Sequence, residues 1–228
     1  MIDISHKHRL DKHKLIAGIP VDLGSDDHFN FQYKVPIVGS SFTGKTCLIQ
    51  RAIKHRFNNS YDLTFGADCF LYNAKISNNI ISLQIWDTAG QEAFNSITKV
   101  FYKNAKAVII VFDMTSKSSF ESLETWIEEV RQNTEPKTLL FLVGNKIDLE
   151  DQIELQEEEV IDYAKKIGID IFIKSSARTG ENIQELFLGV CKSLFLEYAI
   201  NEPQIQQKTK QRLKNIKDPQ QKGYKCIC

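Results

Sequence analysis

Residues 39–46, "GSSFTGKT", combine residue types that could hold the phosphates of a nucleotide. Gly39 and Gly44 would let backbone N–H groups turn toward an anion, and Lys45 could reach the β- and γ-phosphates. The Thr46 hydroxyl could hold Mg²⁺ where a helix begins. Because an apolar run precedes the stretch and a helical pattern follows it, we predict a phosphate-binding loop rather than a chance turn.

A second motif, "WDTAGQE" at residues 86–92, follows a β-rich run. Asp87 would bring a carboxylate to the magnesium through its water shell. Gly90 could offer a backbone N–H to a γ-phosphate, and Gln91 could orient an attacking water. The motif therefore predicts hydrolysis at the terminal phosphate.

Two further motifs follow other apolar runs: "NKID" at residues 145–148 and "SSAR" at residues 175–178. Asp148 could accept two hydrogen bonds from guanine, which offers N1–H and an exocyclic amine, whereas adenine offers neither pattern. A buried carboxylate that needs those donors can reject the wrong base by roughly 10⁴–10⁵. The predicted ligand is thus a guanine nucleotide.

The elements that must position these motifs are short apolar runs that alternate with helical patterns from Tyr33 onward. Runs such as Ala107–Phe112 and Leu139–Val143 are apolar throughout, as expected when helices cover both faces of a sheet. Residues 77–79 separate two β-rich runs and predict a hairpin. We therefore expect an α/β fold with a mostly parallel six-stranded sheet, one antiparallel edge strand, and a ligand crevice at the carboxyl ends of the strands.

The composition separates a neutral body from a basic tail. The 228 residues include 29 Lys and Arg and 29 Asp and Glu, but residues 203–228 carry seven basic residues against one acidic. No groove-reading motif accompanies the tail, so nucleic acid is not the expected partner. Five cysteines without repeating spacing favour a reducing compartment, and the N-terminal His residues lack the further ligands of a metal site.

In this order the motifs resemble those of the Ras superfamily of small GTPases, most closely the Rab family, over about residues 33–200. The stretches "SLQIW", "FNSIT", "FYKNA" and "IVFDMT" are similar to those that distinguish Rab proteins from Ras and Rho relatives. The resemblance implies the small-GTPase form of the P-loop NTPase fold. The expected domains are a poorly ordered arm (1–32), a GTPase domain (33–200) and a basic, flexible tail (201–228).

The resemblance also implies roles for individual residues. Phe57 would stack beside the guanine, and Tyr61 would lie over the phosphates. Asn145 and Lys146 would flank the base, and Ala177 would offer its N–H to the guanine oxygen. The implied nucleotide-binding set is Ser41, Phe42, Thr43, Gly44, Lys45, Thr46, Cys47, Phe57, Tyr61, Thr64, Gly90, Asn145, Lys146, Asp148, Ser176, Ala177 and Arg178.

The implied mechanism is a switch driven by slow hydrolysis of GTP to GDP. Thr64 would reach Mg²⁺ only when the γ-phosphate is present, so that Thr46, Thr64 and Asp87 form the metal site and Lys45, Thr64 and Gln91 the catalytic set. The implied partners are an exchange factor, a GTPase-activating protein, effectors, a GDP-dissociation inhibitor and the prenylation machinery. Such a protein, expected to be a monomer, would regulate vesicle and membrane trafficking by recruiting effectors in its GTP state.

The chain ends in "KGYKCIC", whose Cys226 and Cys228 resemble the doubly geranylgeranylated end of Rab proteins. Two lipid chains, or one with a basic patch, hold a protein on a membrane, whereas one chain is marginal. We expect a cytoplasmic protein that is reversibly anchored to the cytosolic face of endomembranes. The alternative is an unmodified basic tail.

Several positions depart from the Rab pattern. Cys69 stands where Rab proteins usually have a Phe. This position belongs to an expected effector surface whose other members are Trp86 and Phe101. The alternative to partner contact for these two rings is ordinary packing in the core. Phe42 is bulky for a phosphate loop, and second-switch arginines are replaced at Ala93 and Asn95. These changes leave open a nucleotide-binding scaffold with little turnover, whereas "NKID" disfavours an ATP-dependent protein.

Arg178 replaces the lysine usual after Ser-Ala. We expect a mild effect, because the contact with the base at this point of the loop is mainly made by the backbone.

Overall fold

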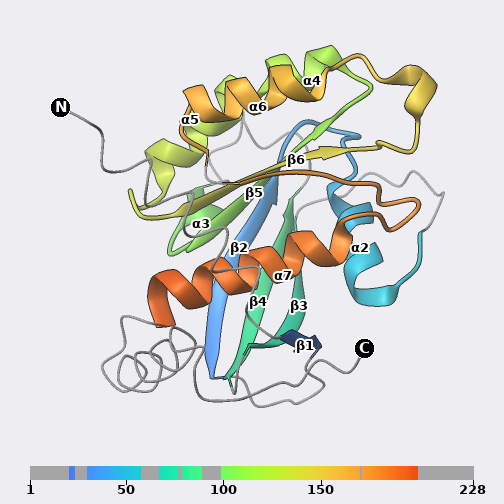
Figure 1. Ribbon diagram of the computed structural model, residues 1–228. Helices are drawn as coiled ribbons and strands as arrows, with labels where there is room; N and C mark the ends of the chain where they lie inside the picture. Colours follow the sequence, from blue (N-terminus) through green and yellow to red (C-terminus); the bar gives the residue numbers. More distant parts are fainter. Residues whose placement is uncertain are drawn as a thin grey trace, which may run out of the picture.

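The computed structural model describes residues 21–23, 30–57, 67–76, 79–88, 99–169 and 171–199. Its centre is one sheet in the order β1-β3-β4-β2-β5-β6-β7 (Figure 1). The β3–β4 pair is antiparallel, and β2, β4, β5, β6 and β7 pair in parallel. The strands are β1 (Val21–Leu23), β2 (Phe31–Val38), β3 (Ala67–Ile76), β4 (Asn79–Thr88), β5 (Ala107–Asp113), β6 (Leu139–Asn145) and β7 (Ile171–Lys174).

Strands β2 to β7 confirm the predicted six-stranded sheet with its antiparallel strand. A seventh strand, β1, pairs antiparallel with β3, where Val21 lies opposite Ile76 and Leu23 opposite Ala74. Both β1 and the first two residues of β2 fall within residues 1–32, the segment expected to be a poorly ordered arm. A three-residue strand is too short for periodicity to reveal.

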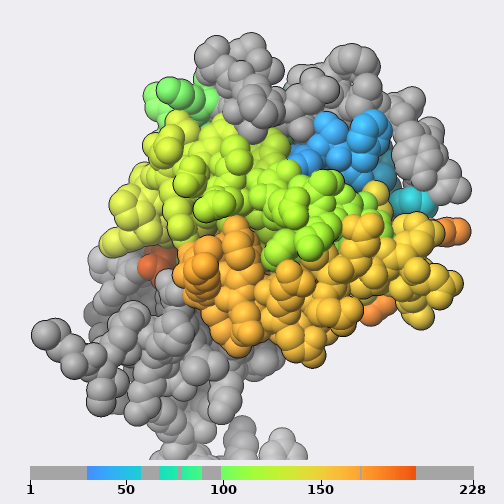
Figure 2. Space-filling model, turned by 90° about the horizontal axis from the view of Figure 1, so that it is seen from above, coloured from blue at the N-terminus to red at the C-terminus, as the bar shows by residue number. Residues whose placement is uncertain are grey.

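Helices cover both faces of the sheet, as the apolar strands predicted. In Figure 1, α5 and α6 lie above β5 and β6, whereas α7 crosses in front of β2 and β4. Seen from above, the green to orange residues of the upper helices form a continuous layer (Figure 2). The helices are α2 (Lys45–Lys54), α3 (Lys99–Tyr102), α4 (Lys117–Glu121), α5 (Leu123–Asn133), α6 (Glu157–Lys166) and α7 (Ile183–Leu194), with short helical turns η3 (Glu150–Gln152) and η4 (Phe195–Ala199).

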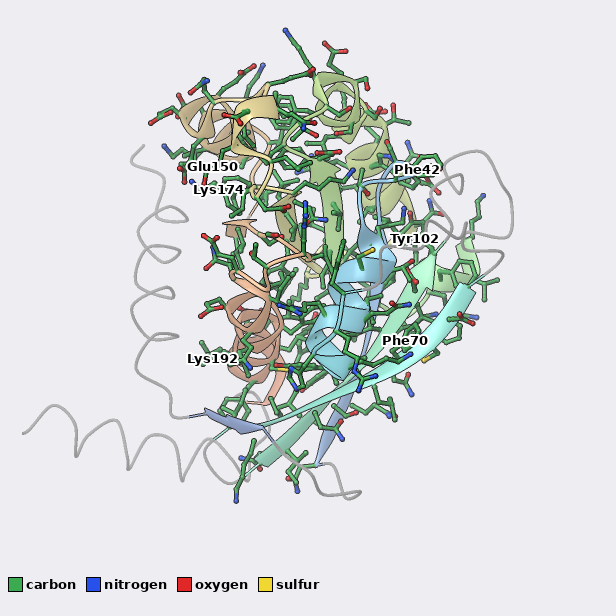
Figure 3. All side chains as sticks on the ribbon, turned by 90° about the vertical axis from the view of Figure 1, so that its right-hand side faces the viewer. Phe42, Phe70, Tyr102, Glu150, Lys174 and Lys192 are labelled. Carbon is green, nitrogen blue, oxygen red and sulfur yellow. The ribbon has the colours of Figure 1, made fainter. Side chains whose placement is uncertain are left out.

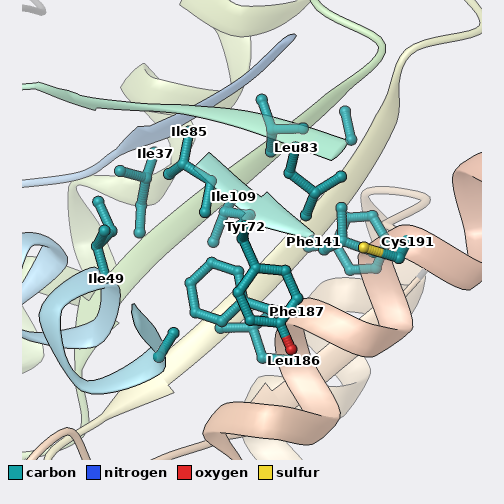
Figure 4. Close-up of a cluster of buried hydrophobic side chains, with 14 of the residues drawn as sticks. Ile37, Ile49, Tyr72, Leu83, Ile85, Ile109, Phe141, Leu186, Phe187 and Cys191 are labelled. Carbon is teal, nitrogen blue, oxygen red and sulfur yellow. The ribbon is translucent and has the colours of Figure 1, made fainter. Parts of the chain in front are cut away.

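Each face of the sheet has its own apolar core. Alternate residues of β5 point to opposite faces: Ile109 packs with α2 and α7, whereas Ile110 packs with α5 and α6. In the first core the rings of Tyr72 and Phe187 lie 5.2 Å apart (Figure 4). Between these two cores the parallel strands β2, β4, β5, β6 and β7 have their carboxyl ends at one end of the molecule.

The last described turn packs at the opposite end of the strands. The ring of Tyr198 lies 5.8 Å from that of Tyr33 near the start of β2, and its hydroxyl donates to the Lys137 carbonyl, just before β6, at 3.3 Å. Among the described residues, no helix has the length and apolarity needed to cross a bilayer.

Candidate nucleotide-binding site

The loop between β2 and α2 has the backbone geometry of a phosphate-binding loop. Gly39 has φ 135°, and a Cβ on it would lie 2.1 Å from the Val111 carbonyl oxygen. Gly44 has φ 92°, and a Cβ there would lie 2.4 Å from Nδ2 of Asn145. Both positions therefore require glycine, which explains the spacing of the motif.

The Lys45 side chain curls back over this loop. Its residue is 6% exposed, and its Nζ donates to the carbonyls of Gly39 at 2.7 Å and Ser40 at 3.1 Å. Lys45 is also the first residue of α2, whose first turn has no acidic residue. A buried ammonium beside a helix N-terminus suits a phosphate group.

Phe42 is the unusual residue of the loop. It adopts φ 66°, in the left-handed region, and is 66% exposed. Figure 3 shows Phe42 at the same end of the molecule as Lys174, the last residue of β7, and away from Lys192. A bulky side chain in this conformation costs on the order of 1 kcal/mol, so the loop dictates the backbone at Phe42 rather than the reverse.

Asp87 and Thr46 supply oxygen atoms near the start of α2. Asp87 is 1% exposed and lies in register with Ile37, two residues before Gly39. Burial raises the pKa of the Cys47 thiol, and the nearby Asp87 carboxylate raises it further while Lys146 lowers it. A buried carboxylate and a hydroxyl are the hard donors that Mg²⁺ takes, so these two residues fit the expected ion.

Asp148 and the "SSAR" loop meet at the base-binding end. The Ser176 hydroxyl donates to Asp148 Oδ1 at 2.6 Å, which fixes the carboxylate. The Arg178 guanidinium, on a side chain 63% exposed, lies 3.9 Å from Asp148 Oδ2. Arg178 thus reaches the carboxylate that is expected to read the base, a side-chain contact that the sequence did not predict.

Asn145 joins the two ends of the site. Its Nδ2 donates to the Thr43 carbonyl at 2.8 Å, and its Oδ1 accepts from the Ala177 N–H at 3.2 Å. Asn145 is 1% exposed, so both hydrogen bonds are shielded from water. One amide therefore connects the loop before α2 to the loop that carries Ala177.

Three contacting side chains were missed from the sequence, those of Trp126, Arg51 and Asp113. Trp126 Nε1 donates to the Ser40 hydroxyl at 3.3 Å, and Arg51 donates to the Thr179 carbonyl at 2.6 Å. Asp113, whose carboxylate Thr115 binds, pairs with Lys146. Of these, only Asp113 could have been predicted from the sequence, because it ends an apolar run as Asp87 does. The contacts of Trp126 and Arg51 depend on how the helices pack.

The three expected effector residues lie together. Cys69 faces Trp86 in register, and the rings of Trp86 and Phe101 lie 5.8 Å apart. Lys34 Nζ lies 5.0 Å above the Trp86 ring and donates to the Val100 carbonyl at 2.7 Å. Trp86 and Phe101 are half-buried and Cys69 is exposed, so these five residues form a surface patch, called here the Trp86 patch.

Other expected residues are described only in part or not at all. Phe57 is half-buried and packs against the first core. Outside the described residues lie Tyr61, Thr64, Gly90, Gln91, Ala93, Asn95, Cys226 and Cys228.

Comparison with known proteins agrees with this geometry. The Ras family matches residues 34–196. Over 186 residues, 80% of this chain and 86% of the relative, the chain is 40% identical to "Putative ras-related protein Rab-5B" of Dictyostelium discoideum. The chain therefore belongs to the Ras family. Within that family it is a Rab small GTPase, which binds GTP and GDP and hydrolyses GTP.

Proposed function

We propose that this Rab protein is a Mg²⁺-dependent switch that recruits effectors in its GTP state and regulates membrane trafficking. The observation that carries the nucleotide site is the Asn145 amide, which ties the Lys45 loop to the loop that carries Ala177, beside Asp148. A ligand that spans both loops must have phosphates at one end and a base with two adjacent donors at the other. GTP and GDP meet this description.

The described residues divide the work of binding. Lys45 neutralises the β- and γ-phosphates from its position above the loop, and Asp148, held by Ser176, reads the guanine. Thr46 and Asp87 would hold the Mg²⁺, and the bound ion would offset phosphate charge. Thr64 and Gln91 complete the proposal by sensing the γ-phosphate and orienting the attacking water.

Competition binding tests the nucleotide. The purified chain should bind a fluorescent GDP analogue with Mg²⁺ and lose it to excess GTP but not to excess ATP. Asp148→Ala should weaken guanine binding at least about a hundredfold, because the bound base would leave two donors unpaired. Asp151→Ala, an exposed carboxylate in η3, is the matched control and should bind as the native chain does. Equal competition by ATP would refute the proposal.

Effector recruitment is proposed for the Trp86 patch, because half-buried aromatic rings anchor interfaces. Hydrolysis of GTP is proposed to be slow until a partner protein accelerates it by about 10³–10⁵. The sequence offers no evident arginine to stabilise the transition-state charge from within the chain. Affinity capture with GDP-loaded and GTP-analogue-loaded protein tests recruitment. Partners that bind only the second form, and are lost on Trp86→Ala, would support it; identical partners for both forms would contradict it.

Membrane attachment is proposed for the tail through lipid on Cys226 and Cys228. Seven basic residues precede these cysteines and would each add roughly 1 kcal/mol near an anionic leaflet. The double change Cys226→Ser and Cys228→Ser should release the protein from membranes without changing GDP binding. Unchanged partitioning between membrane and supernatant would refute lipid anchoring.

A further inference from the structure

The two carboxylate oxygens of Asp113 have different partners. Oδ1 accepts hydrogen bonds from the N–H of Thr115 at 2.8 Å and from its hydroxyl at 2.7 Å. Oδ2 lies 2.6 Å from Nζ of Lys146. One oxygen is therefore occupied by the turn after β5, which leaves the other directed at the lysine of the base-binding loop.

Asp113 is anchored to the frame that carries this loop. It ends β5 and lies in parallel register with Asn145, the last residue of β6. Its own N–H donates to the Ser119 hydroxyl at 3.0 Å, and the next N–H, of Met114, donates to the Asn145 carbonyl at 3.0 Å. Asp113 is 7% exposed, so its carboxylate has little freedom to move.

The Lys146 side chain has many rotamers that a partner must restrict. Its backbone adopts φ 66°, and its side chain, 32% exposed, is long and rich in rotamers. Fixing a free lysine side chain costs rotamer entropy, and lysine is among the side chains that lose the most. A carboxylate that already holds the ammonium removes much of that cost before a ligand arrives.

We infer that Asp113 is a positioning residue for the guanine nucleotide: its Oδ2 holds the Lys146 ammonium and so keeps the lysine stem along the flank of the bound base. The inference rests on the proposed function, in which Lys146 lies beside the base. When the carboxylate is lost, the stem must be ordered at each binding event, and the nucleotide is released faster. The phosphate end is untouched.

Asp113→Asn is the informative change, because the amide oxygen can still accept from Thr115 while the charge facing Lys146 is removed. The rate at which a fluorescent GDP analogue leaves the Mg²⁺-loaded protein should rise about three- to tenfold, the effect of losing one charge-assisted contact. Thr115→Val is the matched control: it removes a hydrogen bond to the other oxygen and should change release less than about twofold. The factor by which EDTA accelerates release should be the same in all three proteins.

A mutant cycle separates positioning from general loosening of the fold. Lys146→Met should itself speed release, and adding Asp113→Asn should have no further effect, because the group that Asp113 positions is gone. If Asp113→Asn does not fold, Asp113→Glu, which displaces the carboxylate by one methylene, should speed release in the native background and not beside Lys146→Met.

Three results would overturn the inference: unchanged release in Asp113→Asn, the same acceleration with and without Lys146, or an altered EDTA factor. Each presupposes that the native chain retains GDP, which is measured first. A native chain that retains no GDP would instead refute the proposed function, so the two failures are distinguishable.

Discussion

Asn145 shows how much of the site depends on single side chains. Its amide nitrogen and oxygen bind different loops, Thr43 on one side and Ala177 on the other. An aspartate would lose the donor and a leucine would lose both groups. The residue type is therefore dictated by two backbone partners that lie far apart in the sequence.

Asn145→Ala should release GDP at least about tenfold faster, because two buried hydrogen bonds of roughly 1 kcal/mol each are lost and their partners are left unpaired. Dissociation of a fluorescent GDP analogue measures this rate. Asn133→Ala removes a comparable amide bond, to the Glu129 carbonyl inside α5, and should leave the rate unchanged. Equal effects of the two changes would contradict the linking role of Asn145.

Phe42 tests whether the phosphate loop carries backbone strain. Phe42→Gly should raise the free energy of unfolding by about 0.5–1 kcal/mol, or the melting temperature by about 1–4 °C, because glycine tolerates φ 66° without steric cost and little of the ring is buried. Thermal unfolding at fixed GDP and Mg²⁺ measures it. Val100→Gly, exposed on α3, is the control and should destabilise. A lower melting temperature for Phe42→Gly would show that the ring makes stabilising contacts.

Cys69 is exposed but is not an activated thiol. Burial raises its pKa, and the nearby Lys34 only partly offsets this. A raised thiol pKa means less thiolate at neutral pH, so alkylation of Cys69 should be slow at pH 7 and accelerate as pH rises through 9. Mass spectrometry of an iodoacetamide time course, in the Cys226→Ser and Cys228→Ser background, measures it. Fully buried Cys191 should stay unmodified; rapid labelling of Cys69 at pH 7 would contradict the prediction.

At the scale of helices and strands, much of the fold could be predicted from the sequence. The apolar runs became β5 and β6 because their residues face helices on both sides, and the "NKID" and "SSAR" loops met because parallel strands end together. The contact of Arg51 with Thr179 could not be predicted, since it joins α2 to a loop through tertiary packing alone. Strand β1 could not be predicted either, because its three residues are too few to show an alternating pattern.

Arg51 should therefore matter to the base loop although it belongs to the phosphate-side helix. Its guanidinium also donates to the His55 carbonyl at 3.2 Å, and Gly180 packs directly against it. Arg51→Met should speed GDP release about two- to fivefold, because the loop that carries Ala177 loses one charge-assisted bond of modest net value. Arg131→Met, which removes a similar bond to the Ile167 carbonyl, is the control and should not change release. Identical GDP release rates for the two variants would show that Arg51 does not support nucleotide binding.

At the scale of the whole molecule, β1 and the nucleotide site lie at opposite ends of the β3–β4 hairpin. β1 pairs only with residues 74–76, whereas Asp87 lies near the far end of β4. Asn30 keeps its two bonds with Ile80 independently of β1. Stability and nucleotide binding should therefore respond separately to loss of the chain before Asn30.

Removal of residues 1–29 tests this separation. The truncated chain should fold with a melting temperature lower by only a few degrees, since three strand pairings contribute about 1–2 kcal/mol in net terms. Its GDP release should match that of the full chain within about twofold. Thermal unfolding and GDP dissociation measure the two effects; a chain that no longer retains GDP would show that the N-terminal residues support the site.

The packing of η4 at the amino ends of the parallel strands places the start of residues 200–228 at the pole opposite the phosphate loop. The eight residues of β2 place the phosphate loop about 26 Å from the strand's beginning, at roughly 3.3 Å per residue. Under the proposed lipid attachment, the tether to the bilayer would leave the protein from the pole that carries neither Phe42 nor Asp148. Regulators could then approach the nucleotide without displacing the tether.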